Sequence, residues 1–531
     1  MTASVAQYDV IIVGAGPVGL VLALILQAQG HNPLIIERHS ARYGLPRAVG
    51  IYHQAVEVFN TLGLHDELFK TTITHSGDLM EDFAILEGSE GQCLARIPFT
   101  KKLKTGLPES YHLSQPDLEE ILEEACKSRG IQVRRSTTVT DVRDETTHVV
   151  VSAEDRQGHL ELRALFVVGC DGSKSTVRRS AGIRFLTEPG VSSRWLIVDI
   201  VPKSPEIMAT WKDARVAKQY LNWRRTMTSV PAPPYRRRWE VMLLPDESFA
   251  ESQKPEFIWP LLAEFGCKPE NADIQRTAVY KLEGGWCEKF HKGRILLAGD
   301  AAHVAPPFLA QGLNSGLRDA TNLSWRLDFA LLYPQKNWHG LFQDYSTEQG
   351  GTTQRFVKAA IMLEKLFCVT DENAAKQRDA MISNGPLALP DLGILGSPGM
   401  YVADREGDAD SKLGAGRHFP EDLIRAGNDQ QRLYEMAQWG WLLLFAQHAY
   451  SSQELESTLT MQRFREVLKG TYIIVGPEHC EDIGGTIREY MQENSLSAVL
   501  IRPDRYVYGG AKSIGGVERL IEDVINYTES T

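Results

Sequence analysis

Gly299 and Asp300 directly follow a short apolar stretch, and their types and position indicate a ligand-binding turn. Residues 294–298 are predicted to form a buried strand, so the Asp300 carboxylate comes at the strand's carboxyl end, where open α/β sheets bind ligands. Pro306 and Pro307 then interrupt the chain, and residues 311–314 begin an amphipathic helix. The first N–H groups of that helix lack partners and lie at the positive end of its dipole. This pattern predicts a site for a ligand with hydroxyl groups and a negative charge.

A second ligand-binding pattern lies at the amino terminus. Gly14, Gly16 and Gly19 complete a GxGxxG sequence between an apolar strand over 8–13 and a helix from Pro17 to about residue 29. A further strand over 33–36 ends in Glu37, where a carboxylate should meet the ribose of an adenosine. GxGxxG alone can be a tight structural turn, but here its context is that of a dinucleotide-binding unit. Together the two patterns indicate FAD, because the reduced flavin ring carries the charge that the helix at 311 would stabilise.

The chain resembles the class A FAD-dependent aromatic hydroxylases, the group that includes p-hydroxybenzoate hydroxylase and phenol hydroxylase. Residues 168–173, Val-Gly-Cys-Asp-Gly-Ser, resemble a third signature of that group. The resemblance is strongest to the 3-(3-hydroxyphenyl)propionate hydroxylase subgroup, through residues 311–327, 219–220, 236–240 and 502–504. It spans nearly the whole chain. Beyond the glycines and Glu37, it implies FAD contacts from Arg38, Arg47, Gln115, Asp171, Gly299, Asp300, Pro306, Gly312, Leu313 and Asn314.

The resemblance also implies a reaction. NADH or NADPH reduces FAD, dioxygen adds at the flavin C4a position, and the resulting hydroperoxide hydroxylates a phenol ortho or para to its hydroxyl group. No metal is required. Four residues could assist: His112, Tyr220 and Tyr235 could accept or relay a proton, and Arg225 could stabilise an anionic substrate. Each also has a structural interpretation, as a hydrogen-bonded or ion-paired group.

The composition is that of a soluble globular protein and is consistent with an enzyme that acts on small molecules. Of 531 residues, 43% are hydrophobic and 24% charged, and the net charge of −11 argues against a nucleic-acid or anionic-membrane surface. The seven scattered cysteines form no CxxC pair, so neither disulfides nor a metal site are expected, and the compartment should be reducing. The apolar run over 18–28 is too short to span a bilayer. We expect a cytoplasmic protein. The sequence leaves open whether the protein forms a homodimer.

The three flavin motifs are far apart, so the expected fold is α/β with a discontinuous Rossmann-like FAD domain over 1–75, 111–185 and 280–400. Residues 76–110 and 186–279 should form an inserted β-sheet substrate domain, with strands over 195–201 and 238–244. Residues 383–416 are predicted to be a linker. Residues 411–531 should form a thioredoxin-like module. Redox activity would need a pair of cysteines, and Cys480 stands alone, so we expect a structural or dimerisation role for this module. The sequence Glu348-Gln349-Gly350-Gly351 departs from the group and predicts a helix end or kink.

Other flavin chemistry on the same scaffold stays open, because a fold does not select a reaction. Baeyer–Villiger oxygenation of a polyketide-like substrate, halogenation and ring reduction are alternatives, although the Trp-x-Trp-x-Ile-Pro signature of halogenases is absent. A non-catalytic flavin- or nicotinamide-binding sensor is the alternative from a different class.

We predict that the purified protein carries FAD and not FMN, because GxGxxG and Glu37 are arranged for an adenosine diphosphate portion that FMN lacks. Chromatography of the chromophore released by denaturation would identify it. Recovery of FMN would contradict the prediction.

Overall fold

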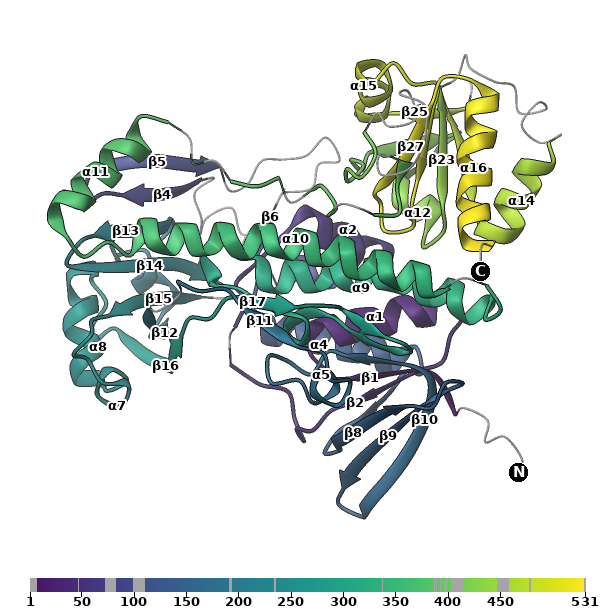
Figure 1. Ribbon diagram of the computed structural model, residues 1–531. Coiled ribbons are helices and arrows are strands. Elements are labelled where there is room, and N and C mark those ends of the chain that lie inside the picture. Colours follow the sequence, from purple (N-terminus) through teal and green to yellow (C-terminus); the bar gives the residue numbers. More distant parts are fainter. Residues whose placement is uncertain are drawn as a thin grey trace.

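The computed structural model describes residues 7–45, 47–71, 83–98, 110–190, 193–233, 235–336, 338–385, 387, 389–391, 393–396, 399–402, 414–446, 458–476 and 479–529. Three large β-sheets, with helices packed against them, form a mixed α/β structure (Figure 1). In the described residues no helix is long and apolar enough to cross a membrane.

The first sheet is built on short apolar strands that are buried on both faces, as parallel strands covered by helices require. Its order is β18-β19-β10-β1-β2-β7, and β9 and β8 extend it from β10. The sheet comprises β1 (Tyr8–Val13), β2 (Pro33–Ile36), β7 (Gln132–Arg134), β8 (Thr138–Asp144), β9 (Val149–Asp155), β10 (Gly158–Gly169), β18 (His291–Lys292) and β19 (Ile295–Leu297). The strand predicted over 33–36 is confirmed.

Helices from distant parts of the sequence pack around this sheet. They are α1 (Pro17–Ala28), α2 (His53–Thr61), α3 (His65–Lys70), α4 (Gln115–Ser128), α5 (Thr176–Ser180) and α9 (Gln311–Leu332). Two small sheets lie at its margin: β3 (Gly50–Tyr52) with β6 (Ser110–His112), and β11 (Phe185–Thr187) with β17 (Gly285–Cys287) and β20 (His303–Val304). Short 3₁₀ turns η3 (Gly299–Ala301) and η4 (Pro307–Leu309) precede α9, which begins at the predicted residue.

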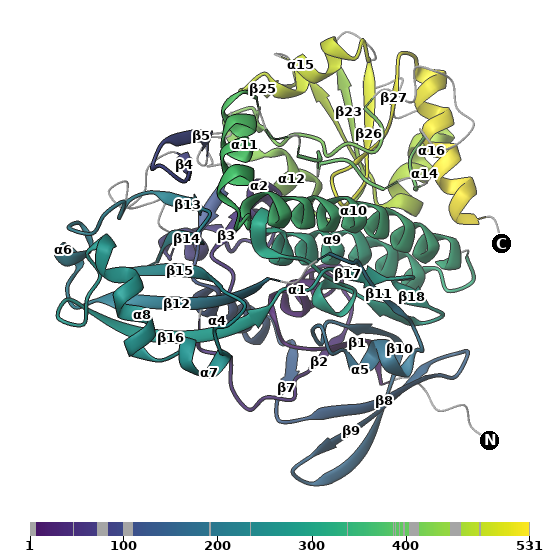
Figure 2. The same cartoon turned by 60° about the vertical axis from the view of Figure 1, so that its left-hand side comes forward.

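The second sheet has seven strands in the order β16-β12-β15-β14-β13-β4-β5 (Figure 2). Its strands are β4 (Phe83–Glu87), β5 (Cys93–Pro98), β12 (Arg194–Pro202), β13 (Ala217–Asn222), β14 (Arg225–Ala232), β15 (Arg236–Leu243) and β16 (Ala272–Lys281). Around it lie α6 (Pro205–Met208), α7 (Phe249–Ser252), α8 (Pro255–Leu262), η2 (Ala263–Phe265) and α11 (Glu372–Ser383). Side chains of α8 and η2 form a separate hydrophobic core with one face of the sheet.

The third sheet lies in the carboxyl-terminal part, in the order β22-β21-β25-β24-β23-β26-β27. Its strands are β21 (Leu423–Ala426), β22 (Asp429–Arg432), β23 (Leu442–Ala446), β24 (Thr471–Val475), β25 (Cys480–Asp482), β26 (Ala498–Ile501) and β27 (Val507–Ala511). Its helices are α12 (Leu433–Ala437), α14 (Leu459–Leu468), α15 (Thr486–Glu493) and α16 (Ile514–Glu529). Strands β23 and β24 are parallel, whereas β26 is antiparallel to both β23 and β27.

Helix α10 (Trp338–Phe367) runs without a break through Gly350 and Gly351, so a helix end at these glycines, one of the two predicted alternatives, is wrong. Another segment instead approaches closely at Gly351, whereas Gly350 has nothing within 4 Å of a hypothetical Cβ. A Cβ on Gly396 would lie 2.6 Å from the carbonyl oxygen of Glu348 and 2.9 Å from the Cα of Gly351. This direct packing outweighs a helix-propensity cost of about 1 kcal/mol per glycine. Part of the predicted linker over 383–416 lies outside the described residues, but Met400 and Tyr401 within it are buried against neighbouring elements.

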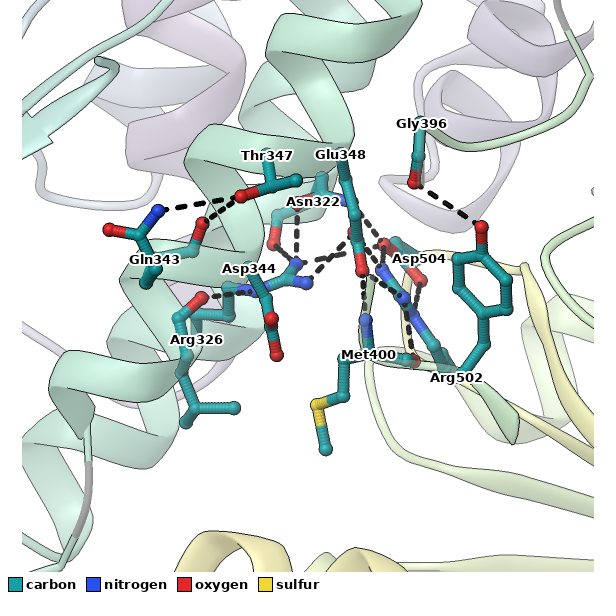
Figure 3. Close-up of polar contacts among 12 residues, drawn as sticks. Asn322, Arg326, Gln343, Asp344, Thr347, Glu348, Gly396, Met400, Arg502 and Asp504 are labelled. Carbon is teal, nitrogen blue, oxygen red and sulfur yellow. Dashed lines mark hydrogen bonds and ion pairs between the residues drawn. The ribbon is translucent and has the colours of Figure 1, made fainter. Parts of the chain in front are cut away.

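Glu348, in the middle of α10, joins α9 to the carboxyl-terminal sheet (Figure 3). Its carboxylate accepts hydrogen bonds from Arg326 of α9 at 2.9 Å and from Arg502, which follows β26, at 2.7 and 2.8 Å. Asp504 accepts from Arg502 and from Asn322 of α9. Since these four charged side chains are fully buried, the two guanidinium groups depend on the two carboxylates for compensation. Burial alone would raise the pKa of Glu348, but Arg326 and Arg502 lower it to about 2.

Glu348→Gln should lower the free energy of unfolding at pH 7 by about 3–5 kcal/mol, because it leaves buried positive charge uncompensated. Urea denaturation followed by tryptophan fluorescence measures this loss. The depressed pKa adds stability that is complete above the ordinary value of 4.5 and disappears as pH falls through about 2. The difference between parent and variant should therefore shrink below pH 4.5. Glu372→Gln, in the exposed pair with Lys376, is the matched control, and equal losses in both variants would contradict the prediction.

Candidate functional site

The three motifs with ligand-binding patterns meet at one edge of the first sheet. The N–H of Gly14 donates to Ile36, that of Cys170 donates to Val13, and that of Ala298 donates to Gly169, at 2.8, 2.8 and 3.0 Å. These bonds continue the ladder past the carboxyl ends of β1, β2, β10 and β19. GxGxxG, Asp171 and Gly299-Asp300 therefore lie side by side, although nearly 300 residues separate the first from the last.

The glycine-rich loop is crowded on one side and open on the other. Gly14 has φ +113°, and a Cβ there would lie 2.3 Å from the carbonyl oxygen of Cys170. A Cβ on Gly19 would lie 2.2 Å from the oxygen of Gly14, whereas Gly16 has nothing within 4 Å of that position. Only glycine suits the crowded positions, and Gly16 leaves space for a ligand to approach the backbone at the start of α1.

A cavity of about 180 Å³ opens beside this loop. Glu37 lines it, and its carboxylate accepts hydrogen bonds from the N–H groups of Ala15 (2.9 Å) and His39 (2.8 Å). A carboxylate has about four acceptor positions, so Glu37 keeps capacity for ribose hydroxyls. Asp171 accepts through Oδ2 from Thr176 and Val177, while its buried Oδ1 has no partner among the described residues. An unpaired carboxylate oxygen beside a cavity fits a ligand that donates hydrogen bonds.

The cavity wall also includes residues that the sequence patterns did not single out. Arg42 and Arg135 both contact Glu123, and Arg38 and Arg47 complete a basic rim beside the acidic groups. A guanidinium-rich rim suits a diphosphate. Arg135 directly follows the strand β7. This position could have indicated a ligand contact from the sequence, because ligands bind where parallel strands end.

Asp319 of α9 holds the Gly299-Asp300 turn from behind. Its Oδ2 accepts hydrogen bonds from the N–H of Gly299 at 2.8 Å and from Nε2 of His303 at 2.7 Å, in a fully buried position. Arg178 of α5, which follows the third motif, donates to the carbonyl of Ala301 at 2.8 Å. The Asp300 side chain points outward and is exposed, so it is available to a ligand. Desolvation by the surrounding protein nevertheless raises its pKa.

Helix α9 begins without a side-chain cap. Ala310 precedes it with φ +50°, and Gly312 has nothing within 4 Å of a hypothetical Cβ. Its first N–H groups are therefore open to a negatively charged ligand atom. Pro306 is buried and Leu313 is partly buried against the main core.

The side chains of two residues predicted to contact FAD form hydrogen bonds within the protein. The Asn314 amide accepts from the N–H of Tyr52 at 2.9 Å and donates to the carbonyl of Ala310 at 2.8 Å. Gln115 accepts from the N–H of Ala48 at 2.8 Å and donates to Glu119 at 2.7 Å. Both side chains shape the ligand-binding segments, and Pro17 begins α1 behind Gly16.

One face of the second sheet lies over these segments. The Arg238 guanidinium donates to the backbone carbonyl of Arg47, and Nδ1 of His112 bonds to the carbonyl of Pro231 at 3.1 Å. Met242 belongs to a small apolar cluster that includes Phe308 of η4. Three contacts, two from β15 and one from β14, thus attach this sheet to the residues around the open helix end.

Of the four candidate catalytic residues, the structure brings His112 to this region. His112 is buried on β6, and burial lowers its pKa to about 4, although its bond to Pro231 acts in the opposite direction. The imidazole is neutral near pH 7. Since a carbonyl only accepts, Nδ1 carries the hydrogen and Nε2 has acceptor character.

Tyr220 and Arg225 lie elsewhere, and Tyr235 is exposed to solvent. Tyr220 lies on the opposite sheet face, in the core with α8, and donates to Asp213 at 3.0 Å, because its neighbour Gln219 takes the other face. Arg225 forms a two-pronged ion pair with Glu247, at 2.8 and 2.5 Å, which compensates its charge. Tyr235 is 43% exposed beside the turn between β14 and β15. This geometry favours structural roles for Tyr220 and Arg225.

Among the described residues, one group has metal-ligating side chains close together: His53, Glu57 and His418. The Arg505 guanidinium lies 3.3 Å from the Glu57 carboxylate, as does His418. Because the Arg505 guanidinium already compensates the Glu57 carboxylate, the geometry favours an ion-pair cluster over a metal site.

Comparisons with known proteins agree with this site. The family described as FAD binding domain matches residues 7–360. A probable NADH-specific resorcinol 4-hydroxylase of Rhodococcus jostii (strain RHA1) is 30% identical over 97% of this chain and 94% of its own length. The 3-(3-hydroxy-phenyl)propionate/3-hydroxycinnamic acid hydroxylase of Mycolicibacterium smegmatis is 30% identical over 72% of this chain and 65% of its own.

Two solved structures share the fold over 99% of this chain and all of theirs. The flavin-dependent monooxygenase PieE, in complex with FAD and substrate, has a TM-score of 0.80 at 20% identity. Aklavinone-11 hydroxylase, with FAD and aklavinone, has a TM-score of 0.78 at 22% identity.

Asp300→Ala should weaken FAD binding about ten- to a hundredfold, because it removes a charge-assisted hydrogen bond of roughly 1.5–3 kcal/mol. Fluorescence titration of the apoprotein with FAD measures the affinity. Asp273→Ala, an exposed aspartate of β16, is the control and should bind FAD like the parent. Unchanged affinity in Asp300→Ala would make Gly299-Asp300 a structural turn only.

Proposed function

We propose that this chain, which belongs to the FAD binding domain family, is an FAD-dependent aromatic hydroxylase that adds one oxygen atom to a phenol. The balanced reaction consumes the phenol, NAD(P)H, a proton and dioxygen, and yields a catechol or hydroquinone, NAD(P)⁺ and water. Bound FAD supplies the hydride acceptance and oxygen activation that no side chain can provide.

The observation that carries the proposal is the row of ligand-binding segments at the edge of the first sheet. The open space at Gly16, the remaining acceptor capacity of Glu37 and the unpaired oxygen of Asp171 fit an adenosine diphosphate. Further along the same edge, the exposed Asp300 fits the hydroxyl-bearing chain of FAD. We assign FAD contacts to the residues that the sequence predicted: Gly14, Gly16, Pro17, Gly19, Glu37, Arg38, Arg47, Gln115, Asp171, Gly299, Asp300, Pro306, Gly312, Leu313 and Asn314.

The protein's own residues would bind the flavin and the substrate, orient them and exclude water. The open first turn of α9 would stabilise negative charge on the ring system, and its orientation depends on the bonds from Asp319 to Gly299 and His303. The contacts of Arg238 and Met242 with the segments at Arg47 and Phe308 would limit the access of water. His112, neutral at pH 7, is the proton acceptor that we favour among the original candidates.

We also propose a separate role for each of the three sheets and the residues around it. Residues 1–75, 111–185 and 280–400 would hold FAD, and residues 76–110 and 186–279 would cover the substrate; the pairing of β4 with β13 supports this grouping. For residues 411–531, the parallel pair β23–β24 with antiparallel β26 and β27 supports a thioredoxin-like module. Cys480 has no cysteine beside it in β25, which supports a structural role. NADH is the nicotinamide that we favour, from the name of the relative that matches 97% of the chain.

The purified yellow protein should oxidise NADH and consume oxygen several times faster when a suitable phenol is added, and the product mass should rise by one oxygen atom. Oxygen uptake, NADH absorbance and mass spectrometry over a panel of neutral and anionic phenols measure this. A lactone or ester product would indicate Baeyer–Villiger chemistry instead. No stimulation by any phenol, with FAD bound, would favour a sensor.

A further inference from the structure

Strand β15 presents two different sets of side chains to its two faces. Trp239, Val241 and Leu243 join the hydrophobic core with α8, so Arg238, Glu240 and Met242 belong to the opposite face. Arg238 reaches the carbonyl of Arg47, and Met242 packs in the cluster that includes Phe308. Glu240 lies between them and therefore looks toward the same segments of the proposed flavin site.

Glu240 is the centre of a row that crosses five strands. The register pairs Gln219 with Thr228, Thr228 with Glu240, Glu240 with Ile197, and Ile197 with Ala278. All of these except Ile197 are half-exposed, whereas Thr226 and Met242, the next inward-facing positions on one side, and Arg238, the next on the other side of Glu240, are buried. The row is thus an accessible part of this face.

Within the row, hydrogen-bonding capacity is concentrated on Glu240. The Thr228 hydroxyl donates to Gln219 at 2.7 Å, and the Gln219 amide donates to the carbonyl of Met227 at 3.2 Å. The side chain of Glu240, in contrast, has no hydrogen bond or ion pair with any described residue. The two cations that act on its carboxyl, Arg238 and Arg276, both bond to Asp199 instead, at 2.8 and 3.5 Å.

The charges around Glu240 define what it can bind. The pKa of its carboxyl is raised overall, because burial raises it more than Arg238 and Arg276 lower it, and Asp199 raises it further. Both guanidinium groups are already matched by Asp199. Arg236, two positions from Arg238 on the same face, donates to the neutral oxygens of Ser114 and Pro233. The two cations on either side of Asp199 are therefore compensated, and Arg236 is the cation of this strand face without a carboxylate partner among the described residues. A substrate carboxylate would meet repulsion from Glu240, whereas a phenolic hydroxyl could donate to it.

We infer that Glu240 is a substrate-binding residue that accepts a hydrogen bond from a hydroxyl group of the ring, and that the substrate is an uncharged phenol without a carboxylate side chain. This inference rests on the proposed hydroxylase function and specifies its substrate class. The hydrogen bond also orients the ring and increases its electron density, which favours attack ortho or para to that hydroxyl.

The test compares Glu240→Gln with the parent holoenzyme on two probes, resorcinol as an uncharged phenol and 3-hydroxybenzoate as an anionic one. We expect kcat/KM for resorcinol to fall at least tenfold, because a charge-assisted bond is replaced by a neutral one. The ratio of kcat/KM for resorcinol to that for 3-hydroxybenzoate should fall as well. A structural defect would lower both values alike and leave the ratio unchanged.

Two further variants complete the experiment. Glu240→Asp keeps the charge, so it should keep the preference for resorcinol even if the rate falls. Glu270→Gln, an exposed carboxylate of the same domain, should match the parent. FAD content, measured by absorbance, establishes that each variant is loaded.

The outcomes separate the two proposals. A parent enzyme that hydroxylates phenols, with an unchanged resorcinol preference in Glu240→Gln, would overturn the assignment of Glu240 alone. A parent that prefers 3-hydroxybenzoate would overturn the inferred substrate class. A parent that hydroxylates no phenol would overturn the hydroxylase function, and this inference with it.

Discussion

The compensation of two buried guanidinium groups by Glu348 is the interaction on which the arrangement of α9, α10 and the carboxyl-terminal sheet depends. Arg326 lies on α9, Arg502 follows β26, and Glu348 reaches both from α10 with its side chain fully buried. A charge in such a place is tolerated only when it is paired and hydrogen-bonded, so the three elements can adopt few alternative positions. Helix α9 is thereby fixed at its carboxyl-terminal half.

The amino-terminal half of α9 is held in a different way. Asp319 connects the helix to Gly299 and His303 through a single carboxylate oxygen, and Asn314 connects it to β3. The first turn, in contrast, has no cap of its own. A rigid helix with an open amino-terminal end is preorganised for a negative charge, because nothing must be displaced before the ligand binds.

The second sheet shows how the same strands serve stability and recognition. Residues such as Trp239 and Tyr220 pack against α8, while alternate residues face the proposed flavin site. Charged groups on that side are mostly neutralised by one another, as Asp199 is by Arg238 and Arg276. Glu240 stands apart from this pairing, and its accessibility makes it the group through which the sheet could distinguish substrates.

The amino-acid sequence by itself determined the cofactor class and many of the elements around it. Gly14, Gly19 and Gly299 could be read directly, because a left-handed or crowded backbone leaves a local signature. The strand over 33–36 and the start of α9 were predictable for the same reason, since apolar runs and proline or glycine punctuation are local. Tertiary structure alone decided that α10 continues through Gly350 and Gly351, because packing at Gly396 outweighs propensity. It also decided that Arg225 pairs with Glu247 and that Glu240, not Tyr220, faces the flavin segments. Which face of a strand is covered, and which charge finds a partner, depends on residues far away in the sequence, and no local pattern contains that information.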